Sequence, residues 1–314
     1  MKRAAISAAL ILFSAFNLFA FGGRQKSAEK IPPVDQIQLQ APLPIPQPTR
    51  AERIIKSLAQ AYPDRIEKIE FRNDDWALFM NNKWYYFANG RILPEEMLIQ
   101  IENYRPNQFY NYPADLPPWK ELTPEEITRY NSWTANRSQN PPRRSSFFLD
   151  DLWQASNRVE TEKRLVRITF LGKSTKVHHA IHDKLAKVES LIFTIAKNDP
   201  AVQTWINGLG NLEGYGWRNI AETQSRSFHS YGLAVDLLPR NMGNKQTYWL
   251  WTSQYRNDWY NVSYNERYHP PESVIKAFEV YGFIWGGKWP MFDTMHFEYR
   301  PEVILLNGLP LERY

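Results

Sequence analysis

The stretch Ser227-Phe-His229-Ser-Tyr-Gly232-Leu-Ala-Val-Asp236 places a histidine, a glycine and an aspartate beside a short apolar run. Gly232 allows the chain to reverse direction. The alternating residues from Leu233 to Leu238 then predict a buried strand that carries Asp236. Because a turn separates them, His229 and Asp236 can converge on one point although they lie apart in the sequence.

A second stretch, Phe292-Asp293-Thr-Met-His296-Phe-Glu298-Tyr299, ends in a strand expected at Phe297–Arg300. His296 and Glu298 should share one face of this strand, and a bend is needed to bring Asp293 near them. A hydrolytic zinc site takes three protein ligands of N or O type and keeps one open position. It also needs a carboxylate that is not a ligand, to accept a proton. The two stretches together supply two histidines and two aspartates for such a site.

The pattern Ser-x-His-x-x-Gly-x-Ala-x-Asp followed by Asp-x-x-His resembles the VanY-type D-alanyl-D-alanine carboxypeptidases and the related L-alanyl-D-glutamate endopeptidases of cell-wall lysis. The resemblance covers roughly residues 165–300, with both motifs complete and in order. It implies that His229, Asp236 and His296 bind Zn²⁺ and that Asp293 is the catalytic base.

The resemblance also implies an arginine that contacts substrate and the developing oxyanion, and Arg218 in Tyr215-Gly-Trp-Arg218 fits that role. Arg226 is the nearby alternative. Ser227 is expected in the substrate-binding region, where it would orient a ligand or the backbone from behind the metal.

Two departures from the family pattern favour an endopeptidase slightly over a carboxypeptidase. The spacer from Arg218 to His229 is shorter than in typical carboxypeptidases, and the base is Asp293 rather than a glutamate. The expected function is therefore a zinc peptidase that cuts D-residue-containing bonds of peptidoglycan stem peptides. The alternative is a non-catalytic cell-wall-binding or scaffold protein that retains the fold.

Three further histidines offer a different metal site. His178, His179 and His182 fall on a helix expected at Val177–Lys197, and a spacing of four residues can bind a metal. No third ligand accompanies them, so a solvated helix face is favoured over a storage or sensing module. The aromatic segments Tyr248–Trp251 and Trp285–Trp289 can line a groove or belong to the core.

Composition excludes several classes of protein. The chain has 314 residues, 43% of them hydrophobic and 15% aromatic, which excludes general disorder and multiple membrane spans. The 38 basic and 33 acidic residues give a net charge of +5 without a basic run, so no nucleic-acid partner is expected. The absence of cysteine excludes disulfides, thiol nucleophiles and cysteine-based zinc sites.

The N-terminus has two basic residues followed by an apolar run to Phe21, which is typical of a secretory signal peptide. We therefore expect an exported protein of the periplasm or cell surface, with membrane contact only if this segment stays uncleaved as an anchor. The oligomeric state is left open. The expected parts are a signal peptide (1–22), a Pro-rich linker (23–48), an accessory domain (49–145) and a zinc peptidase domain (146–314).

The periodicity of the sequence predicts an α+β fold: a small antiparallel sheet with packed helices around a single zinc site, plus the N-terminal accessory domain. The expected helices are 49–61 (capped by Thr49), 124–130, 147–158, 177–197 and 272–281. The expected strands are a hairpin at 76–80 and 84–87, then 164–171, 233–238 and 297–300.

Overall fold

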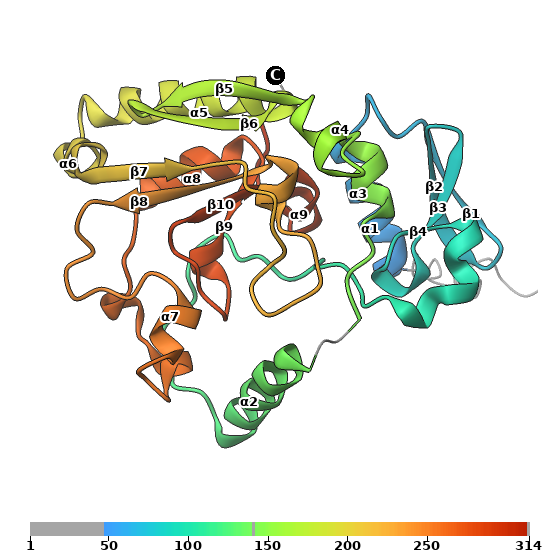
Figure 1. Ribbon diagram of the computed structural model, residues 1–314, viewed down its shortest axis with the longest axis horizontal. Helices are drawn as coiled ribbons and strands as arrows, with labels where there is room; N and C mark the ends of the chain where they lie inside the picture. The colour runs from blue at the N-terminus through green and yellow to red at the C-terminus, as the bar shows by residue number, and fades with distance from the viewer. Residues whose placement is uncertain (1–46, 140–141, 313–314) are drawn as a thin grey trace, which may run out of the picture. The chain divides into compact units, whose positions relative to one another are not determined.

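The computed structural model describes residues 47–139 and 142–312 (Figure 1). The expected signal peptide at 1–22 and all but the last two residues of the expected linker at 23–48 lie outside these ranges. Within the described residues, no helix has the length and apolar character needed to cross a bilayer.

The described chain begins with helix α1 (Arg50–Ala61) and an antiparallel sheet in the order β1-β2-β3-β4. Thr49 caps α1 as predicted, because its side chain accepts a hydrogen bond from the Glu52 N–H. The predicted hairpin is confirmed as β2–β3, and Asn81 and Asn82 form its two-residue turn with positive φ angles. The strands are β1 (Lys68–Arg72), β2 (Asp75–Met80), β3 (Lys83–Tyr86) and β4 (Leu93–Pro94).

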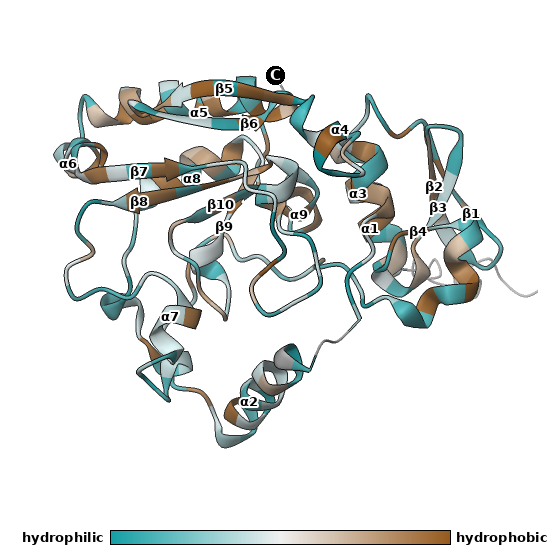
Figure 2. Ribbon diagram, viewed as in Figure 1, coloured by the Kyte–Doolittle hydropathy of each residue, from teal (hydrophilic) through white to brown (hydrophobic). Residues whose placement is uncertain are grey.

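A second four-stranded antiparallel sheet has the order β7-β8-β10-β9 and carries both motif stretches. Its strands are β7 (Leu209–Glu213), β8 (Ala234–Pro239), β9 (Phe283–Trp285) and β10 (His296–Tyr299). β10 lies between β8 and β9, so the strands after the two motifs are direct neighbours. Strand β8 is largely hydrophobic along its length (Figure 2), as expected for a strand covered by other elements.

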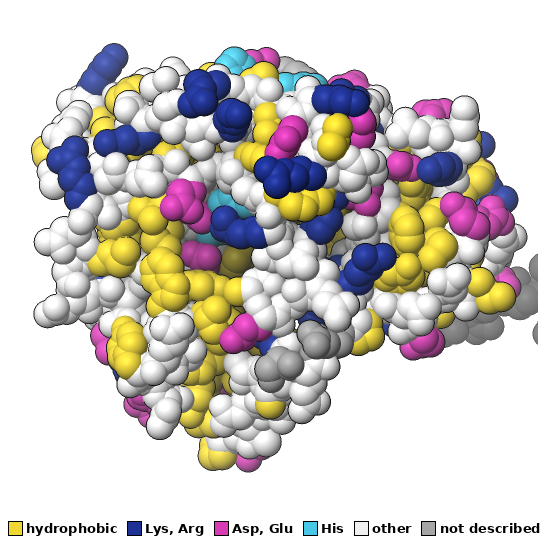
Figure 3. Space-filling model, viewed as in Figure 1, with side chains coloured by type: hydrophobic (Ala, Val, Ile, Leu, Met, Phe, Trp, Pro, Cys, Tyr) yellow, Lys and Arg dark blue, Asp and Glu magenta, His cyan; other side chains and the backbone are white. Residues whose placement is uncertain are grey.

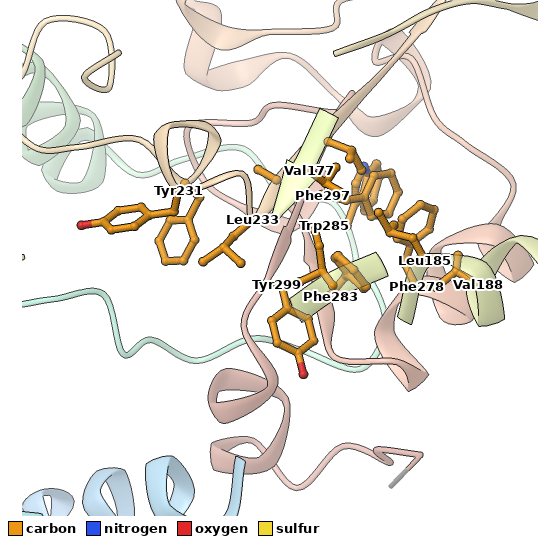
Figure 4. Packing of buried hydrophobic residues seen from close by; sticks show 14 of the residues in the cluster. Val177, Leu185, Val188, Tyr231, Leu233, Phe278, Phe283, Trp285, Phe297 and Tyr299 are labelled. Atoms are coloured by element: carbon orange, nitrogen blue, oxygen red, sulfur yellow. The ribbon is translucent and has the colours of Figure 1, made fainter. Parts of the chain in front are cut away.

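Helices and a two-stranded sheet cover this second sheet. Helix α8 packs on β9, while α5 packs on α8 and on the β5–β6 hairpin (Figure 1). Phe297 of β10 stacks on Phe278 of α8 with ring centroids 4.0 Å apart, and Leu185 and Val188 of α5 extend the same core (Figure 4). The bounds are β5 (Leu165–Phe170), β6 (Lys173–His178), α5 (His182–Ala196) and α8 (Glu272–Val280).

The remaining helices connect and flank these sheets. Helix α9 packs against α1, so the last and the first α-helix of the described residues are in contact. One hydrophobic cluster includes residues of α1, the β2–β3 hairpin, α5, β8 and β10. The division at residue 145 into an accessory and a peptidase domain stays a prediction. The remaining helices are α2 (Pro124–Ser138), α3 (Phe147–Leu152), α4 (Arg158–Glu162), α6 (Pro200–Gly208), α7 (Trp249–Ser253) and α9 (Pro301–Leu306).

The mixture of helices and small antiparallel sheets confirms the predicted α+β class. Two predicted helices were partly wrong. The helix expected at 177–197 begins only at His182, because His178 ends strand β6 and pairs with Leu165 of β5. The helix expected at 147–158 breaks after Leu152, where Gln154 adopts a positive φ angle. The strand signal of β6 was weak because four of its six residues, Lys173 to Lys176, are polar.

Candidate active site

The register of β8 and β10 brings the two motif stretches together. His296 lies directly opposite Asp236 in the antiparallel pair. The Asp236 Oδ1 lies 2.8 Å from His296 Nδ1 and 3.1 Å from His229 Nε2, and these two ring nitrogens are 3.1 Å apart. All three side chains are buried. Non-local strand pairing therefore produces the convergence that the motif spacing predicted.

A tight turn places His229 next to Asp236. The 3₁₀ helix Phe228–Tyr231 ends at Gly232, whose φ of +72° lets its N–H reach back to the His229 carbonyl. Ser227 caps this helix, because its Oγ accepts a hydrogen bond from the His229 N–H. Ser227 thus supports the backbone behind the histidine.

The far nitrogen of each histidine is fixed by an acceptor. His229 Nδ1 lies 2.6 Å from the Gly214 carbonyl, and His296 Nε2 lies 3.1 Å from Glu298 Oε2. Since a carbonyl or carboxylate only accepts, these nitrogens carry the protons. When both imidazoles are neutral, the lone pairs of His229 Nε2 and His296 Nδ1 therefore face each other and Asp236.

With both imidazoles neutral, these three converging donors are suited to a cation. Among the described residues, these donors belong to the one group of three or more potential metal-ligating side chains, His229, Asp236 and His296. Their ligand atoms all lie within 4.8 Å of one another. Burial alone would lower the pKa of His296, but hydrogen bonding to Asp236 and Glu298 and the charges of these carboxylates raise it well above its usual value. The same negative surroundings favour a metal ion, and the residue types fit Zn²⁺.

Asp293 lies beside this group but is not part of it. Its N–H donates to the Gly286 carbonyl at 3.0 Å, and its Oδ1 is buried with no hydrogen-bond partner among the described residues. Burial and the negative charge of Asp236 raise the pKa of Asp293 to about 7. A carboxyl group that gains and loses a proton near neutral pH has the property required of a general base.

The structure distinguishes the two candidate arginines. Arg218 is half-exposed, with Nη2 3.7 Å from Asp236 Oδ2, so it reaches the group from the solvent side. Arg226 instead donates to Asp150 at 2.6 Å, and its guanidinium stacks on the rings of Trp217 and Tyr231. Arg226 therefore holds the fold together, whereas Arg218 can meet a ligand.

The surface above the site is hollowed. In Figure 3, histidine, acidic and basic side chains lie together in this hollow, with hydrophobic side chains along one side. Tyr248 pairs through its backbone with Asp293, and the exposed Trp251 packs edge-on against Tyr248. Trp285 is buried and donates to the Thr294 carbonyl, so it belongs to the core instead. Both aromatic segments therefore reach the site, Tyr248–Trp251 through Tyr248 and Trp285–Trp289 through Trp289, whose ring centroid lies 5.4 Å from that of His296.

The other histidine cluster forms no metal site in the described part of the chain. His178 Nε2 lies 3.0 Å from the Trp153 carbonyl and its Nδ1 accepts from the Ala180 N–H. His182 lies 2.8 Å from the exposed Asp183. The first histidine is therefore a satisfied core residue and the last is a surface residue.

The sequence motifs did not indicate a role for three charged residues next to the site, Glu298, Arg300 and Glu302. They placed Glu298 on the His296 face without a role, and they left out Arg300 and Glu302. The structure joins all three in a buried chain of ion pairs. The signal was present in the alternation His-x-Glu-x-Arg-x-Glu, which puts ionisable residues at every second position from the buried strand β10 into the start of α9.

Comparison with known proteins gives two family matches. Residues 54–109 match a domain of unknown function. No curated protein and no solved structure matched the chain. Residues 221–299 match the D-alanyl-D-alanine carboxypeptidase family, and the segment includes His229, Asp236, Asp293 and His296. Residues 221–299 therefore belong to the D-alanyl-D-alanine carboxypeptidase family, as the two motifs predicted.

Proposed function

We propose that this protein is a zinc-dependent peptidase that hydrolyses D-residue-containing peptide bonds in peptidoglycan stem peptides. The family match supports a metallopeptidase acting on peptidoglycan. The observation that carries the proposal is the convergence of His229, Asp236 and His296 beside a separate buried carboxylate, Asp293. A site used only for structure would have no need of that fourth group.

His229 Nε2, Asp236 and His296 Nδ1 would hold the zinc ion, which supplies Lewis-acid polarisation of the scissile carbonyl. Asp293 takes a proton from the attacking water and returns it to the leaving amine. The Arg218 guanidinium stabilises negative charge on the carbonyl oxygen, as preorganised donors do in such sites. Gly214 and Glu298 hold the two histidines in the required tautomers.

Within this proposal, internal cleavage is favoured slightly over removal of a terminal D-alanine. A carboxypeptidase holds a free carboxylate with a dedicated cation. Arg218, which is half-exposed and 3.7 Å from Asp236, suits either activity. The exposed Trp251 beside Tyr248 provides an apolar border along which a longer peptide can extend.

We further propose that the protein is exported, because its substrate lies outside the cytoplasm and its first residues match a signal peptide. N-terminal sequencing of protein from fractionated cells tests this. A chain recovered in the cytoplasm with Met1 intact would contradict export.

Zinc content is the direct test of the metal assignment. The purified protein should bind one zinc ion, and His229→Ala should lose most of it because one of three ligands is removed. The matched control is His182→Ala, which removes an exposed histidine outside the site and should leave the zinc content unchanged. Full zinc retention in His229→Ala, or loss in His182→Ala, would contradict the assignment.

A further inference from the structure

A continuous chain of buried polar contacts runs from His296 to helix α1. His296 Nε2 lies 3.1 Å from Glu298 Oε2, and Glu298 Oε1 accepts from Arg300 Nη1 at 3.4 Å. Arg300 Nε donates to Glu302 Oε1, and Glu302 Oε2 accepts from the Tyr62 hydroxyl at 2.6 Å. This series of contacts therefore begins at a proposed metal ligand and ends at Tyr62 in the N-terminal part of the protein.

Every member of this chain is buried. Glu298 and Arg300 are 5% exposed, Glu302 is 3% exposed and Tyr62 is 7% exposed. Removing ionised side chains from water costs several kcal/mol per ion unless close partners compensate. An apolar core of the same volume would avoid that cost. The charges are thus best explained by what they hold in place at the inner end, namely the ring of His296.

The N-terminal part holds Arg300 in two independent ways. The Gln108 carbonyl accepts from Arg300 Nη2 at 2.7 Å, and Tyr62 fixes the carboxylate of Glu302 that faces Arg300 Nε. Gln108 and Tyr62 both belong to the segment 54–109 that matches the domain of unknown function. Packing of α1 against α9, which begins at Pro301, brings these groups together.

We propose that Glu298 is a positioning residue that orients His296 for the metal, and that the segment 54–109 stabilises this orientation through Tyr62, Gln108 and Arg300. Glu298 accepts a hydrogen bond from the His296 Nε2–H, so the Nδ1 lone pair of the neutral ring is directed toward Asp236 and His229. The inference rests on the proposed function, since it assumes that these residues bind zinc. It gives the N-terminal segment a role in the metal site.

The test compares two tyrosines of the N-terminal segment. The Tyr62 hydroxyl donates to Glu302 at 2.6 Å and the Tyr85 hydroxyl donates to Asp151 at 2.5 Å. Both rings are buried and pack edge-on against an aromatic neighbour. Tyr62→Phe and Tyr85→Phe therefore remove the same kind of hydrogen bond, but only the first lies on the chain to His296.

Zinc affinity is measured by competition with a chromophoric chelator, and stability by chemical denaturation of the metal-free proteins. Partners of a metal-bound histidine typically contribute about 10- to 100-fold in metal affinity. We expect a loss in this range for Glu298→Gln and a smaller, measurable loss for Tyr62→Phe. Tyr85→Phe should also be destabilised, yet it should bind zinc like the wild type. The visible spectrum of the Co²⁺-substituted protein should change in Glu298→Gln and, to a smaller extent, in Tyr62→Phe. It should not change in Tyr85→Phe.

The outcomes separate the two proposals. If the wild type binds no zinc, the proposed function itself fails. If the wild type binds zinc and Glu298→Gln binds it equally tightly, the positioning role of Glu298 is overturned while the proposed function stands. If Tyr62→Phe and Tyr85→Phe have equal zinc affinities, the contribution of the N-terminal segment is overturned.

Discussion

At the scale of single residues, Asp293 is the group that separates a catalyst from a metal-binding scaffold. It lies three residues before His296 and outside the set of converging ligand atoms. Its carboxyl group is buried next to Asp236, which raises its pKa to about 7. A neutral amide or methyl group at this position would cost less to bury, so the presence of a carboxyl group points to a chemical role.

Replacing Asp293 should therefore abolish hydrolysis without removing the metal. Loss of a general base typically costs about 100- to 10,000-fold in rate, so we expect a loss of this size for Asp293→Ala. Asp236→Ala, by contrast, should lose both zinc and activity because Asp236 is a proposed ligand. Activity assays combined with metal analysis check this. A decrease in rate below about tenfold, short of the range for a base, would show that Asp293 does not carry the proton.

Gly232 shapes the site through its backbone. A Cβ atom at this position would lie 2.7 Å from the His178 backbone nitrogen and 2.8 Å from Leu165 Cδ2. Gly172 has a similar φ of +74°, but a Cβ atom there would have nothing within 4 Å. The two glycines therefore share the same backbone conformation and differ in crowding.

We expect Gly232→Ala to be more destabilising than Gly172→Ala. An alanine in the left-handed region costs about 1–2 kcal/mol, and this applies to both variants. Crowding adds about 1–3 kcal/mol at Gly232 only, and it should also displace His229 and weaken zinc binding. Chemical denaturation of both variants measures the difference. Equal destabilisation of the two variants would mean that the turn at Gly232 accommodates the added methyl group without affecting the site.

At the scale of elements, strand β6 ends in a histidine that is kept neutral. Burial lowers the pKa of His178 to about 4, from its usual value of 6.5. Between these two values the unfolded chain binds more protons than the folded chain, so stability is lost as the pH falls. The loss reaches about 3 kcal/mol at pH 4 for a shift of this size.

A variant without a titratable group at this position should lose less stability in acid. We expect the free energy of unfolding of His178→Asn to fall less steeply than that of the wild type between pH 6.5 and 4. The difference in slope, rather than the absolute stability, is the quantity to measure by denaturant titration at each pH. Parallel curves for the two proteins would show that His178 is not neutral in the fold.

Elements with strong local signals could be predicted from the sequence, and those defined by partners could not. The Thr49 cap fixed the start of α1, and the alternation of β8 and β10 was readable because one face of each carries apolar residues. β1 has an exposed Phe71 and no buried face, so its periodicity gave no signal. The position of His178 on a strand depends on pairing with β5, which local sequence does not encode.

At the scale of the whole molecule, the motifs predicted which residues meet, and tertiary packing determined how they are held. The pairing of His296 with Asp236 could be expected from two strands that each carry a ligand. The packing of α1 against α9 and the contact between Tyr62 and Glu302 join residues 240 positions apart. No spacing rule reaches that far, so the link between the N-terminal segment and the site emerged only from the fold.

The central claim is that the whole protein cuts peptidoglycan stem peptides, and mass spectrometry of digested muropeptides tests it most directly. The zinc-loaded wild type should release fragments cut within the stem peptide at a bond flanked by a D-residue, and Asp293→Ala should release none. Release of D-alanine alone would support the carboxypeptidase form of the same claim. Unchanged muropeptides after incubation with zinc-loaded wild-type protein would contradict it and favour a cell-wall-binding scaffold.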